Sequence, residues 1–592
     1  MKALAIHYGH NCTVGLSIDG EVVSLLSEER LCRIKNATGF PIQTIRETVD
    51  RYLDGDMSQL DHIGIIDGTG LGAVYLRKNG VEPKRYLDYY WMKKAKLWRS
   101  ITHPGWMRLK RTLRSLTRRA RGVKDASHIR DLLIHELGLP PDKVQFFDHH
   151  SCHAAAAAYF SPVADGSEWL MMSLDAEGDN LSSTVSVFDG KDFKRLSTNP
   201  SSVSLGYLYS ETTAYLGMKS NEHEFKLMGM APYADPVHVE RLATELKRLI
   251  WLDQDGGFVT QVDAHRFLHE LCRIYAFERF DVISGAVQKV TEELAVAWVN
   301  FWSEKTRIGK ITVSGGVFMN VKMAKLISEL AQVEYLFVVP SCSDESLPIG
   351  ALWFMNTENG TPTVPVKSLY LGRGFARDHV RSMIERDALS NDFDIEEFAD
   401  DAALAERIAS LLADNEIVAR CCGREEWGAR ALGNRSILCN PSNFSNIERL
   451  NSKIKCRDFW MPFTPSLLAE AFPTYVVNPK NIFAPYMAIT FDVTPLARQH
   501  FAAAVHPRDF TMRPQAVIKD WNPGYHAIIS EFQRLAGIGG ILNTSFNLHG
   551  EPNVSTPEDA IRTVRNSGLD YVLIENFLFH KKPQTESATR HL

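Results

Sequence analysis

Three histidines lie within five residues of one another in the segment DHHSCHAAAAAYF, at positions 149, 150 and 153. The alanines that follow favour a helix. His149 and His153 are four residues apart, so they would lie on one face and could bind a single metal ion. His150 and His153 would also share a face, which leaves the choice of pair open.

A complete metal site needs oxygen ligands from elsewhere in the chain. Asp175 ends the strand-like MMSLD, and Asp344 stands at a strand-to-helix turn, so these two carboxylates are the candidates. Two imidazoles with carboxylates suit iron, manganese or zinc. The alternative is a helix start that Asp148 caps, with the histidines on its surface.

Glycine and arginine gather at two further places that suit anions. In SGGVFMN, Gly315 and Gly316 follow a strand, so the backbone could approach a phosphate closely, although a plain tight turn explains the pair equally well. In GREEWGARALGNRSIL, arginines stand among glycines, and arginine forks match phosphate and carboxylate oxygens. Further basic and small polar side chains that could ring an anion follow along the chain: Arg424, Arg430, Arg435, Lys453, Lys455, Arg457, Arg513, Asn543, Thr544, Ser545 and Asn547.

The elements that would position these residues predict two domains. The pattern strand, polar turn, strand, Asp-Gly hairpin, strand occurs near residues 1–30 and again about 170 residues later, near Trp169 to Asp189-Gly190. This repeat indicates a duplicated nucleotide-binding fold of the actin-like kind. Linker-like sequence at 357–366 places the domain boundary near residue 365. We therefore expect an α/β and α+β protein with domains 1–365 and 366–592.

Composition favours an ordinary globular protein. The chain has 592 residues, 45% hydrophobic and 23% charged, and no apolar run reaches the roughly 18 residues that span a bilayer. The N-terminus reads as a strand and not as a signal peptide, so we expect a cytoplasmic protein. Nine scattered cysteines without a C-x-x-C pair argue against disulfides and a zinc knuckle.

Charge is distributed unevenly. The net charge is −5, but the stretch from Arg77 to Lys124 holds 16 Lys and Arg against Glu82 and Asp88, which makes that stretch +14. Aromatic residues are interleaved with its cations, a pattern that suits a polyanion. An amphipathic helix on an anionic membrane and a solvated helical insert are the alternatives. The cations that would contact a polyanion are Arg108, Lys110, Arg111, Arg114, Arg118 and Arg119.

Taken together, these segments resemble the O-carbamoyltransferase family of the nodulation protein U and tobramycin carbamoyltransferase type. The matching pieces run in family order over nearly the whole chain: HYGHN, EERLCRIKNATGFP, DHHSCHAA, LDAEGD, EFKLMGMAPY, VSGGVFMN, the Asp344 turn, GARALGNRSIL, IKCRDFWMPFTPS, TMRPQAV and the stretch from LNTSFNLHGEP to IENFLFHK.

The resemblance implies an actin-like N-terminal domain, similar to the tRNA-threonylcarbamoyl transferase, and a C-terminal domain that makes a carbamoyl adenylate. It implies that His149, His153, Asp175 and Asp344 hold the metal. It places His10 beside the acceptor hydroxyl, with Lys226, Gly315, Gly316 and Asn320 at the nucleotide. Carbamoyl phosphate would be bound by Arg430, Lys455, Arg513 and Ser545.

The implied reaction uses Fe(II) or another divalent metal, with Mg for ATP, and takes ATP and carbamoyl phosphate as co-substrates. Carbamate is a poor electrophile, so joining it to AMP activates it, and the adenylate must be kept from water until transfer. A metal would polarise the adenylate as a Lewis acid, and His10 has a suitable intrinsic pKa for a base.

This sequence departs from the family pattern at several positions. Glu345 and Ser346 follow Asp344 where Ala-Gly is usual, and Ala429 replaces a proline. Met461 stands where an arginine usually precedes Pro-Phe, which removes one expected anion donor. Asp175 is followed by Ala-Glu-Gly-Asp in place of a glycine-rich turn.

Three hypotheses for the function stay open. The first is O-carbamoyl transfer to an acceptor on a polyanion, such as a hydroxymethylated base in DNA, which would have to be flipped out or single-stranded. The second is the same transfer to a small natural product or sugar. The third is a non-enzymatic nucleic-acid-binding protein on this scaffold. A hydrogenase-maturation carbamoyl transferase fits less well, because it has the opposite domain order and C-x-x-C pairs, and a tRNA threonylcarbamoyl role matches the C-terminal motifs less well. The sequence leaves the oligomeric state open.

Overall fold

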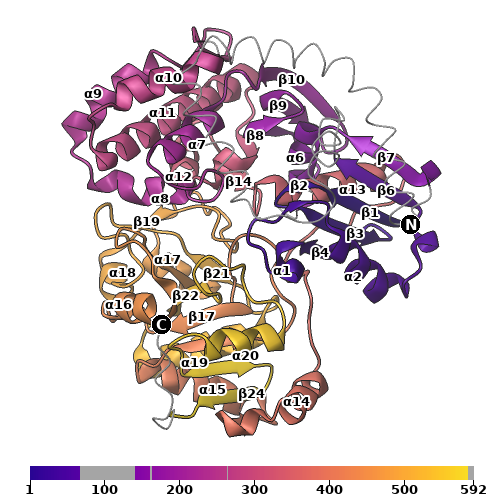
Figure 1. Ribbon diagram of the computed structural model, residues 1–592. Coiled ribbons are helices and arrows are strands. Elements are labelled where there is room, and N and C mark those ends of the chain that lie inside the picture. The colour runs from indigo at the N-terminus through magenta and orange to yellow at the C-terminus, as the bar shows by residue number, and fades with distance from the viewer. Residues whose placement is uncertain (67–140, 161–162, 164, 263, 584–592) are drawn as a thin grey trace. The chain divides into compact units, whose positions relative to one another are not determined.

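The computed structural model of the chain describes residues 1–66, 141–160, 163, 165–262 and 264–583 (Figure 1). The predicted basic segment 77–124, with its six proposed polyanion-binding residues, lies outside this part of the chain. The described residues form two compact units: unit 1 comprises Met1–Leu369, Asn478–Phe483 and Ala488–Thr490, and unit 2 comprises the rest. The main division falls after residue 369, and two short segments beyond residue 477 also belong to unit 1.

Unit 1 contains two five-stranded sheets with the same strand order. The first has the order β4-β3-β1-β6-β7, in which β3 is antiparallel to both β4 and β1, while β1, β6 and β7 run parallel. Its strands are β1 (Lys2–His7), β3 (Thr13–Ile18), β4 (Glu21–Ser27), β6 (His62–Ile66) and β7 (Val144–Phe147).

The second sheet repeats this arrangement strand for strand. Its order is β10-β9-β8-β13-β14, with β9 antiparallel to β8 and β10, and with β8, β13 and β14 parallel. Its strands are β8 (Trp169–Gly178), β9 (Leu181–Phe188), β10 (Phe193–Pro200), β13 (Lys310–Ser314) and β14 (Tyr335–Val338). The repeated hairpin pattern in the sequence thus corresponds to two sheets of one topology.

Two helices fill the space between the sheets (Figure 1). Helix α13 (Leu347–Glu358) packs on β1, β3 and β6 of the first sheet, helix α6 (His149–Ala158) packs on β8, β9 and β13 of the second, and the two helices pack on each other. The alanines of α6 and Gly350 of α13 permit a close approach, because a Cβ on Gly350 would lie 2.0 Å from the carbonyl oxygen of Cys152. The histidine helix is therefore held from both sides.

The remaining described elements of unit 1 flank these layers. The helices of four or more residues are α1 (Glu29–Cys32), α2 (Ile42–Leu53), α7 (Leu205–Tyr215), α8 (Glu224–Met230), α9 (Pro236–Lys247), α10 (Ala264–Tyr275), α11 (Phe280–Thr306) and α12 (Val321–Glu329). The short strands are β2 (Gly9–His10), β5 (Thr38–Gly39), β11 (Trp251–Leu252) and β12 (Phe258–Val259). Helix α12 begins at Val321, because a 3-10 turn over Gly316–Met319 comes first.

Unit 2 is built on one eight-stranded mixed sheet with the order β15-β24-β23-β16-β17-β22-β18-β21. Its strands are β15 (Phe393–Glu397), β16 (Val418–Cys421), β17 (Arg435–Cys439), β18 (Thr464–Leu468), β21 (Gln515–Val517), β22 (Gly540–Ser545), β23 (Tyr571–Ile574) and β24 (Phe577–Lys581). A separate pair is β19 (Phe491–Asp492) with β20 (Thr511–Met512). The helices are α14 (Arg377–Arg386), α15 (Asp401–Ala413), α16 (Asn446–Leu450), α17 (Phe472–Tyr475), α18 (Pro495–His500), α19 (Pro523–Ala536) and α20 (Pro557–Arg565).

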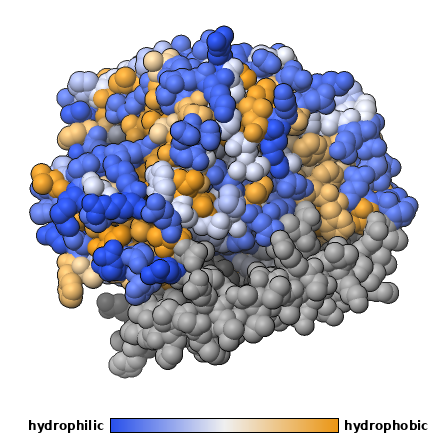
Figure 2. Space-filling view, turned by 90° about the horizontal axis from the view of Figure 1, so that it is seen from above, coloured by the Kyte–Doolittle hydropathy of each residue, from blue (hydrophilic) through white to orange (hydrophobic). Residues whose placement is uncertain are grey.

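The described surface in Figure 2 is mostly hydrophilic, and the cysteines do not form disulfides. Hydrophilic residues cover much of the described surface in Figure 2, interrupted by small apolar areas. Within the described ranges, no helix is both long and apolar enough to cross a membrane. All nine cysteines are free thiols and six of them are buried, as the scattered spacing predicted.

Candidate metal centre and anion site

The start of helix α6 is fixed by two carboxylates. Asp148 is its N-cap and accepts a hydrogen bond from the backbone N–H of Ser151 at 2.8 Å, and Asp179 accepts one from the N–H of His149, also at 2.8 Å. Both carboxylates satisfy N–H groups that the helix leaves unpaired and favour the positive end of its dipole. The capping interpretation and the metal interpretation of this segment are therefore compatible.

Four predicted ligands converge at this helix. Their donor atoms, one from each of His149, His153, Asp175 and Asp344, all lie within 4.8 Å of one another. Nε2 of His153 is 3.2 Å from Oδ2 of Asp175, and Nε2 of His149 is 3.7 Å from Oδ1 of Asp344. Four donors about 2.1 Å from one ion are about 3.4 Å apart in a tetrahedron, so this spacing and this donor set fit a divalent metal.

Each ligand reaches this cluster for a local reason. Asp175 extends from β8, and its Oδ1 accepts a hydrogen bond from the N–H of Ala176 at 2.6 Å. The ring of His149 lies against Gly178, where a Cβ would be 2.1 Å from Cδ2 of that ring. Asp344 begins the short turn before α13, so ligands from α6, from β8 and from this turn meet at the cluster.

The contacts of each imidazole distinguish the two histidine pairs. His150 is fully buried, and its Nδ1 contacts Oγ of Ser173 at 2.8 Å; Ser173 in turn contacts Thr184. Burial, with repulsion from the neighbouring histidines, lowers the pKa of His150 to about 3. His150 is thus a neutral core residue, and the pair that faces the carboxylates is His149 and His153.

Electrostatics at the cluster favour a bound cation. Burial, and then repulsion from Asp175, raises the pKa of Asp344 to about 8. Burial opposes the charged form of His149, but the hydrogen bond to Asp175 and the charges of both aspartates raise its pKa to about 9. A divalent ion would take the place of these protons, since metal ligands bind deprotonated.

Another histidine, His7, lies beside the cluster, and the sequence analysis did not select it as a site residue. Nε2 of His7 is 3.7 Å from Oδ2 of Asp344 and 2.9 Å from the carbonyl oxygen of His10. Burial, followed by repulsion from His149, lowers the pKa of His7 to about 3. His10, the expected base, lies in the short strand β2 opposite Thr38, so His7 connects the backbone of His10 to the metal ligands.

The glycine turn lies next to the same ligands. Gly315 has φ of +92°, and a Cβ there would be 2.4 Å from the carbonyl oxygen of Leu174, so only glycine fits. A Cβ on Gly316 would be 3.1 Å from Oδ1 of Asp175. The turn therefore lies at the edge of the metal cluster, where the N–H of Gly315 donates to the carbonyl oxygen of Cys342 at 2.7 Å.

Three further residues of unit 1 that the sequence analysis singled out are Asn320, Lys226 and Glu345. The Asn320 side chain caps α12 and exchanges two hydrogen bonds with the amide of Gln288, at 2.9 and 3.0 Å, so it orients the turn. Lys226 lies half-buried on α8. Glu345, the departure beside Asp344, is buried and accepts a hydrogen bond from Ser341.

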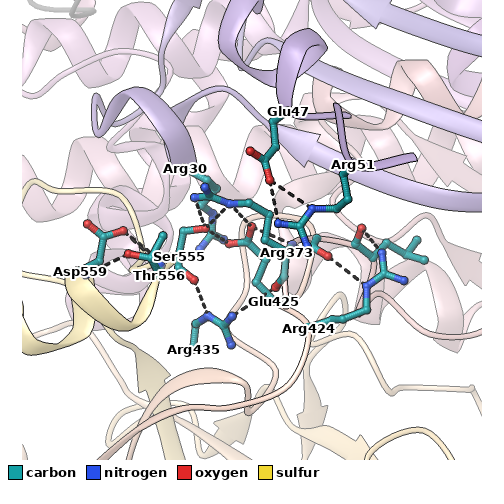
Figure 3. Close-up of polar contacts among 12 residues, drawn as sticks. Arg30, Glu47, Arg51, Arg373, Arg424, Glu425, Arg435, Ser555, Thr556 and Asp559 are labelled. Atoms are coloured by element: carbon teal, nitrogen blue, oxygen red, sulfur yellow. Dashed lines mark hydrogen bonds and ion pairs between the residues drawn. The ribbon is translucent and has the colours of Figure 1, made fainter. Parts of the chain in front are cut away.

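In unit 2, two of the sequence-selected arginines are structural (Figure 3). Arg435 is fully buried and donates to the carbonyl oxygens of Ser555, Cys422, Gly423, Asn434 and Arg373 at 3.0–3.2 Å. Arg424 donates to the carbonyl oxygens of Gly372 and Leu371. Both are engaged by backbone acceptors, and their part in anion binding stays a prediction.

Three other arginines form a cluster of like charges, composed of Arg430, Arg457 and Arg513. Burial, and then repulsion from Arg430, lowers the pKa of Arg457 to about 10. Burial, with repulsion from both other members, lowers the pKa of Arg513 strongly. Among the described residues, neither Arg457 nor Arg513 pairs with a carboxylate, and Nε of Arg513 has no hydrogen-bond partner. Desolvated cations held together in this way make the cluster a candidate anion site.

Lys455 and Ser545, two of the predicted carbamoyl-phosphate ligands, form hydrogen bonds with each other. Nζ of Lys455 donates to the carbonyl oxygen and the hydroxyl of Ser545, the latter at 3.1 Å, and to Oδ1 of Asn547 at 2.8 Å. Arg457 donates to Oγ1 of the neighbouring Thr544 at 2.9 Å. The end of β22 is thus the common support of Lys455 and the arginine cluster.

Comparisons with known proteins define the class. The family pattern described as "Carbamoyltransferase N-terminus" matches residues 2–352, and "Carbamoyltransferase C-terminus" matches residues 409–581. The chain belongs to the carbamoyltransferase family. It thus is a mixed α/β member whose metal-type cluster lies within the N-terminal match and whose arginine cluster lies within the C-terminal one.

Two relatives and one solved structure show what the chain is similar to. The "Nodulation protein NolNO" of Sinorhizobium fredii is 29% identical over 97% of this chain and 79% of that protein. A "3'-hydroxymethylcephem-O-carbamoyltransferase" of Amycolatopsis lactamdurans is 28% identical over 59% of this chain and 63% of that protein. The solved structure of "full-length HypF in the phosphate- and nucleotide-bound form" covers 60% of this chain and 55% of its own, at 11% identity and a TM-score of 0.30.

Proposed function

We propose that this protein is an O-carbamoyltransferase that charges carbamate with AMP in unit 2 and transfers the carbamoyl group to a hydroxyl in unit 1. The observation that carries the proposal is the buried cluster of Arg430, Arg457 and Arg513, in which burial and mutual repulsion lower the pKa of Arg457 and of Arg513, on a chain whose other unit holds a His2Asp2 cluster. The proposal assigns unit 1 the actin-like fold, on the support of its two sheets of one topology.

The arginine cluster would bind carbamoyl phosphate. Hydrolysis of carbamoyl phosphate gives carbamate and phosphate, and a carbamate oxygen then attacks the α-phosphorus of ATP, forming carbamoyl adenylate and releasing pyrophosphate. Arg513 and Arg457 would neutralise the phosphoryl oxygens in a site where charge interactions are stronger than in water. Lys455 would hold the end of β22, with Ser545, in the geometry that the arginines need.

Unit 1 would carry out the transfer. The Gly315–Gly316 turn lies at the edge of the cluster, and the N–H of Gly316 would bind the phosphate of the adenylate. Lys226 would add a cation on the nucleotide side. A divalent metal held by the four ligands would supply Lewis-acid polarisation.

The acceptor hydroxyl would lose its proton to His10. His7 donates a hydrogen bond to the carbonyl oxygen of His10 and so fixes the strand that carries the base. The oxygen of the acceptor forms a bond to the carbamoyl carbon, the bond from that carbon to the AMP oxygen breaks, and AMP leaves. Both imidazoles would then act through position and proton transfer.

For the acceptor, we favour a small molecule with a hydroxymethyl or sugar hydroxyl. The support is the relative named for 3'-hydroxymethylcephem. A hydroxymethylated base in DNA, the other predicted acceptor, rests on the segment 77–124, outside the described residues.

The test of this proposal is pyrophosphate release from ATP. The protein should release pyrophosphate only when carbamoyl phosphate is present, and Arg513→Met should abolish that dependence. Arg498→Met, which removes a cation that lies over the ring of Phe510, is the matched control and should leave release unchanged. Pyrophosphate release that ignores carbamoyl phosphate, or an Arg513→Met variant with normal release, would refute the proposal.

A further inference from the structure

The segment 478–490, here called the staple, alternates between the two units. Residues 478–483 and 488–490 belong to unit 1, and residues 484–487 belong to unit 2. The flanking sequence on both sides, at α17 and at β19, belongs to unit 2. The chain therefore enters unit 1, leaves it and returns within 13 residues, which none of the proposed catalytic steps requires.

One end of the staple holds the C-terminal end of α12. Nζ of Lys480 donates to the carbonyl oxygens of Leu330 and Val333, each at 2.6 Å. Leu330 is the C-cap residue of α12, so the ammonium group lies at the negative end of the helix dipole. Burial lowers the pKa of Lys480, which shows that the ammonium is partly withdrawn from water.

The other end of the staple holds the beginning of the same helix. The N–H of Thr490 points to the carbonyl oxygen of Val321, the first residue of α12, at 3.4 Å. Between the two ends, the N–H of Phe483 donates to Oη of Tyr335 at 3.3 Å. Ile482 and Ile489 are buried. A helix of nine residues, about 13 Å long, is thus fastened at both ends by one loop.

Helix α12 follows directly from the glycine turn at the metal cluster. Its N-cap, Asn320, accepts a hydrogen bond from the N–H of Met323 at 3.2 Å and is bonded to Gln288. A shift of α12 along its axis would therefore move Asn320 and the N–H groups of Gly315 and Gly316. The staple thus contacts both ends of the helix that directly follows this turn.

The middle of the staple is fastened to the strands that flank the arginine cluster. The carbonyl oxygen of Ala484 accepts a hydrogen bond from the N–H of Ala516 in β21 at 2.9 Å, and the sulfur of Met487 accepts one from Thr464 at the start of β18 at 3.6 Å. Arg513 precedes β21 by two residues, and Thr464 follows Phe463, whose ring lies under the guanidinium of Arg457 at 4.8 Å. Ala484 and Met487 thus contact supports of the arginine cluster within unit 2.

We propose that Lys480 is a positioning residue, through which the staple holds α12 and the glycine turn in the arrangement that retains carbamoyl adenylate in unit 1. Lys480 touches neither the reacting atoms nor the metal ligands; it acts through α12. The role in adenylate retention rests on the proposed function, whereas the mechanical role, holding the turn, does not.

The full-length protein tests both roles with three variants. Lys480→Met removes the charge, Lys480→Arg keeps it, and Lys325→Met, the control, removes a lysine that pairs with Glu329 within α12 itself. Hydrogen–deuterium exchange follows the amides of residues 315–329. After mixing with [14C]carbamoyl phosphate and ATP, rapid gel filtration measures the label retained by the protein, and pyrophosphate release measures adenylate formation.

In Lys480→Met we expect faster exchange of the turn and of α12 and loss of label about fivefold faster than in the wild type, the scale of one charge at a helix terminus. Pyrophosphate release should persist, Lys480→Arg should restore retention, and Lys325→Met should behave as the wild type. Normal exchange and retention in Lys480→Met would overturn the proposal, and so would a parallel loss of pyrophosphate release and label, which indicates general damage. A wild type that releases no pyrophosphate would refute the proposed function alone, since the exchange result still decides the role of the staple.

Discussion

Asp175 and Asp344 face the same two imidazoles: Oδ2 of Asp175 lies 3.2 Å, and Oδ1 of Asp344 3.8 Å, from Nε2 of His153, and the same oxygens lie 3.5 and 3.7 Å from Nε2 of His149. Two buried carboxylates this close cannot both be charged without a cation. Burial, together with that repulsion from Asp175, raises the pKa of Asp344 to about 8. A metal ion resolves it, and the first predictions follow from this pair.

Metal binding should release protons, and its affinity should rise with pH. Asp344 with a pKa of about 8 and His149 with a pKa of about 9 are protonated at pH 7 in the metal-free protein, while both bind metal deprotonated. Affinity should therefore increase from pH 6 toward about pH 9 and then level off. Calorimetry with Fe(II) or Mn(II) in buffers of different ionisation enthalpy measures the protons released; a net release of zero at pH 7 would contradict this account.

Metal content should depend on His153 and not on histidines in general. His153→Asn should lose stoichiometric binding, because a neutral amide replaces the imidazole that both aspartates face. The control is His238→Asn, an exposed histidine on α9, which should bind one ion as the wild type does. Elemental analysis after gel filtration decides the matter, and equal metal content in the two variants would remove the assignment.

The negative charge of Asp148 should stabilise the protein only above the acidic range. Burial would raise the pKa of Asp148, but hydrogen bonds from Arg195 and Ser151 outweigh it and lower the pKa from 3.8 to about 2. A carboxyl group with a lowered pKa contributes stability that is fully present above its unfolded value and is lost as the pH falls toward the folded value. Compared with Asp148→Asn, which keeps a capping side chain, the wild type should melt higher at pH 6, and the difference should shrink as the pH falls from about 4 toward about 2. A difference in melting temperature that does not vary with pH would show that the charge has no part in it.

Two arginines of unit 2 should respond to substitution in opposite ways. Arg435→Met leaves several buried carbonyl oxygens without donors and should lower the free energy of unfolding by about 3–5 kcal/mol. Arg513→Met relieves repulsion among desolvated cations, so the melting temperature should be unchanged or higher. Thermal unfolding, with and without inorganic phosphate as ligand, separates the two: phosphate should stabilise the wild type but not Arg513→Met. Loss of stability in Arg513→Met would mean that this arginine is structural.

The sequence predicts local features well because neighbouring residues determine them. The spacing of His149 and His153 on an alanine-rich helix, the Asp148 cap and the repeated hairpins all follow from periodicity and turn chemistry. The candidate carboxylates could be chosen because they end strands. His7 could not be chosen, because it lies inside a buried strand and only the pairing of β1 with its neighbours brings it to Asp344.

The sequence does not distinguish arginines by what surrounds them. Arg435 and Arg430 stand five residues apart in one glycine-rich stretch, yet carbonyl oxygens surround the first, while the second faces Arg457 and Arg513. In the sequence, Arg457 is one of several cations near β18, and only its burial in the structure distinguishes it from them. The sequence does not predict the staple either. No local pattern indicates that Lys480 donates to the C-terminal end of a helix 150 residues earlier in the chain.

The most direct test of the central claim is the product itself. The protein, loaded with Fe(II), is incubated with ATP, 13C-labelled carbamoyl phosphate and a panel of alcohols that includes a hydroxymethylcephem, a sugar and hydroxymethylated single-stranded DNA, and the products are analysed by mass spectrometry. We predict one acceptor that gains the labelled carbamoyl group, with one AMP formed for each transfer and none with Arg513→Met. Labelled product formed without ATP, or AMP formation that does not require carbamoyl phosphate, would contradict the account.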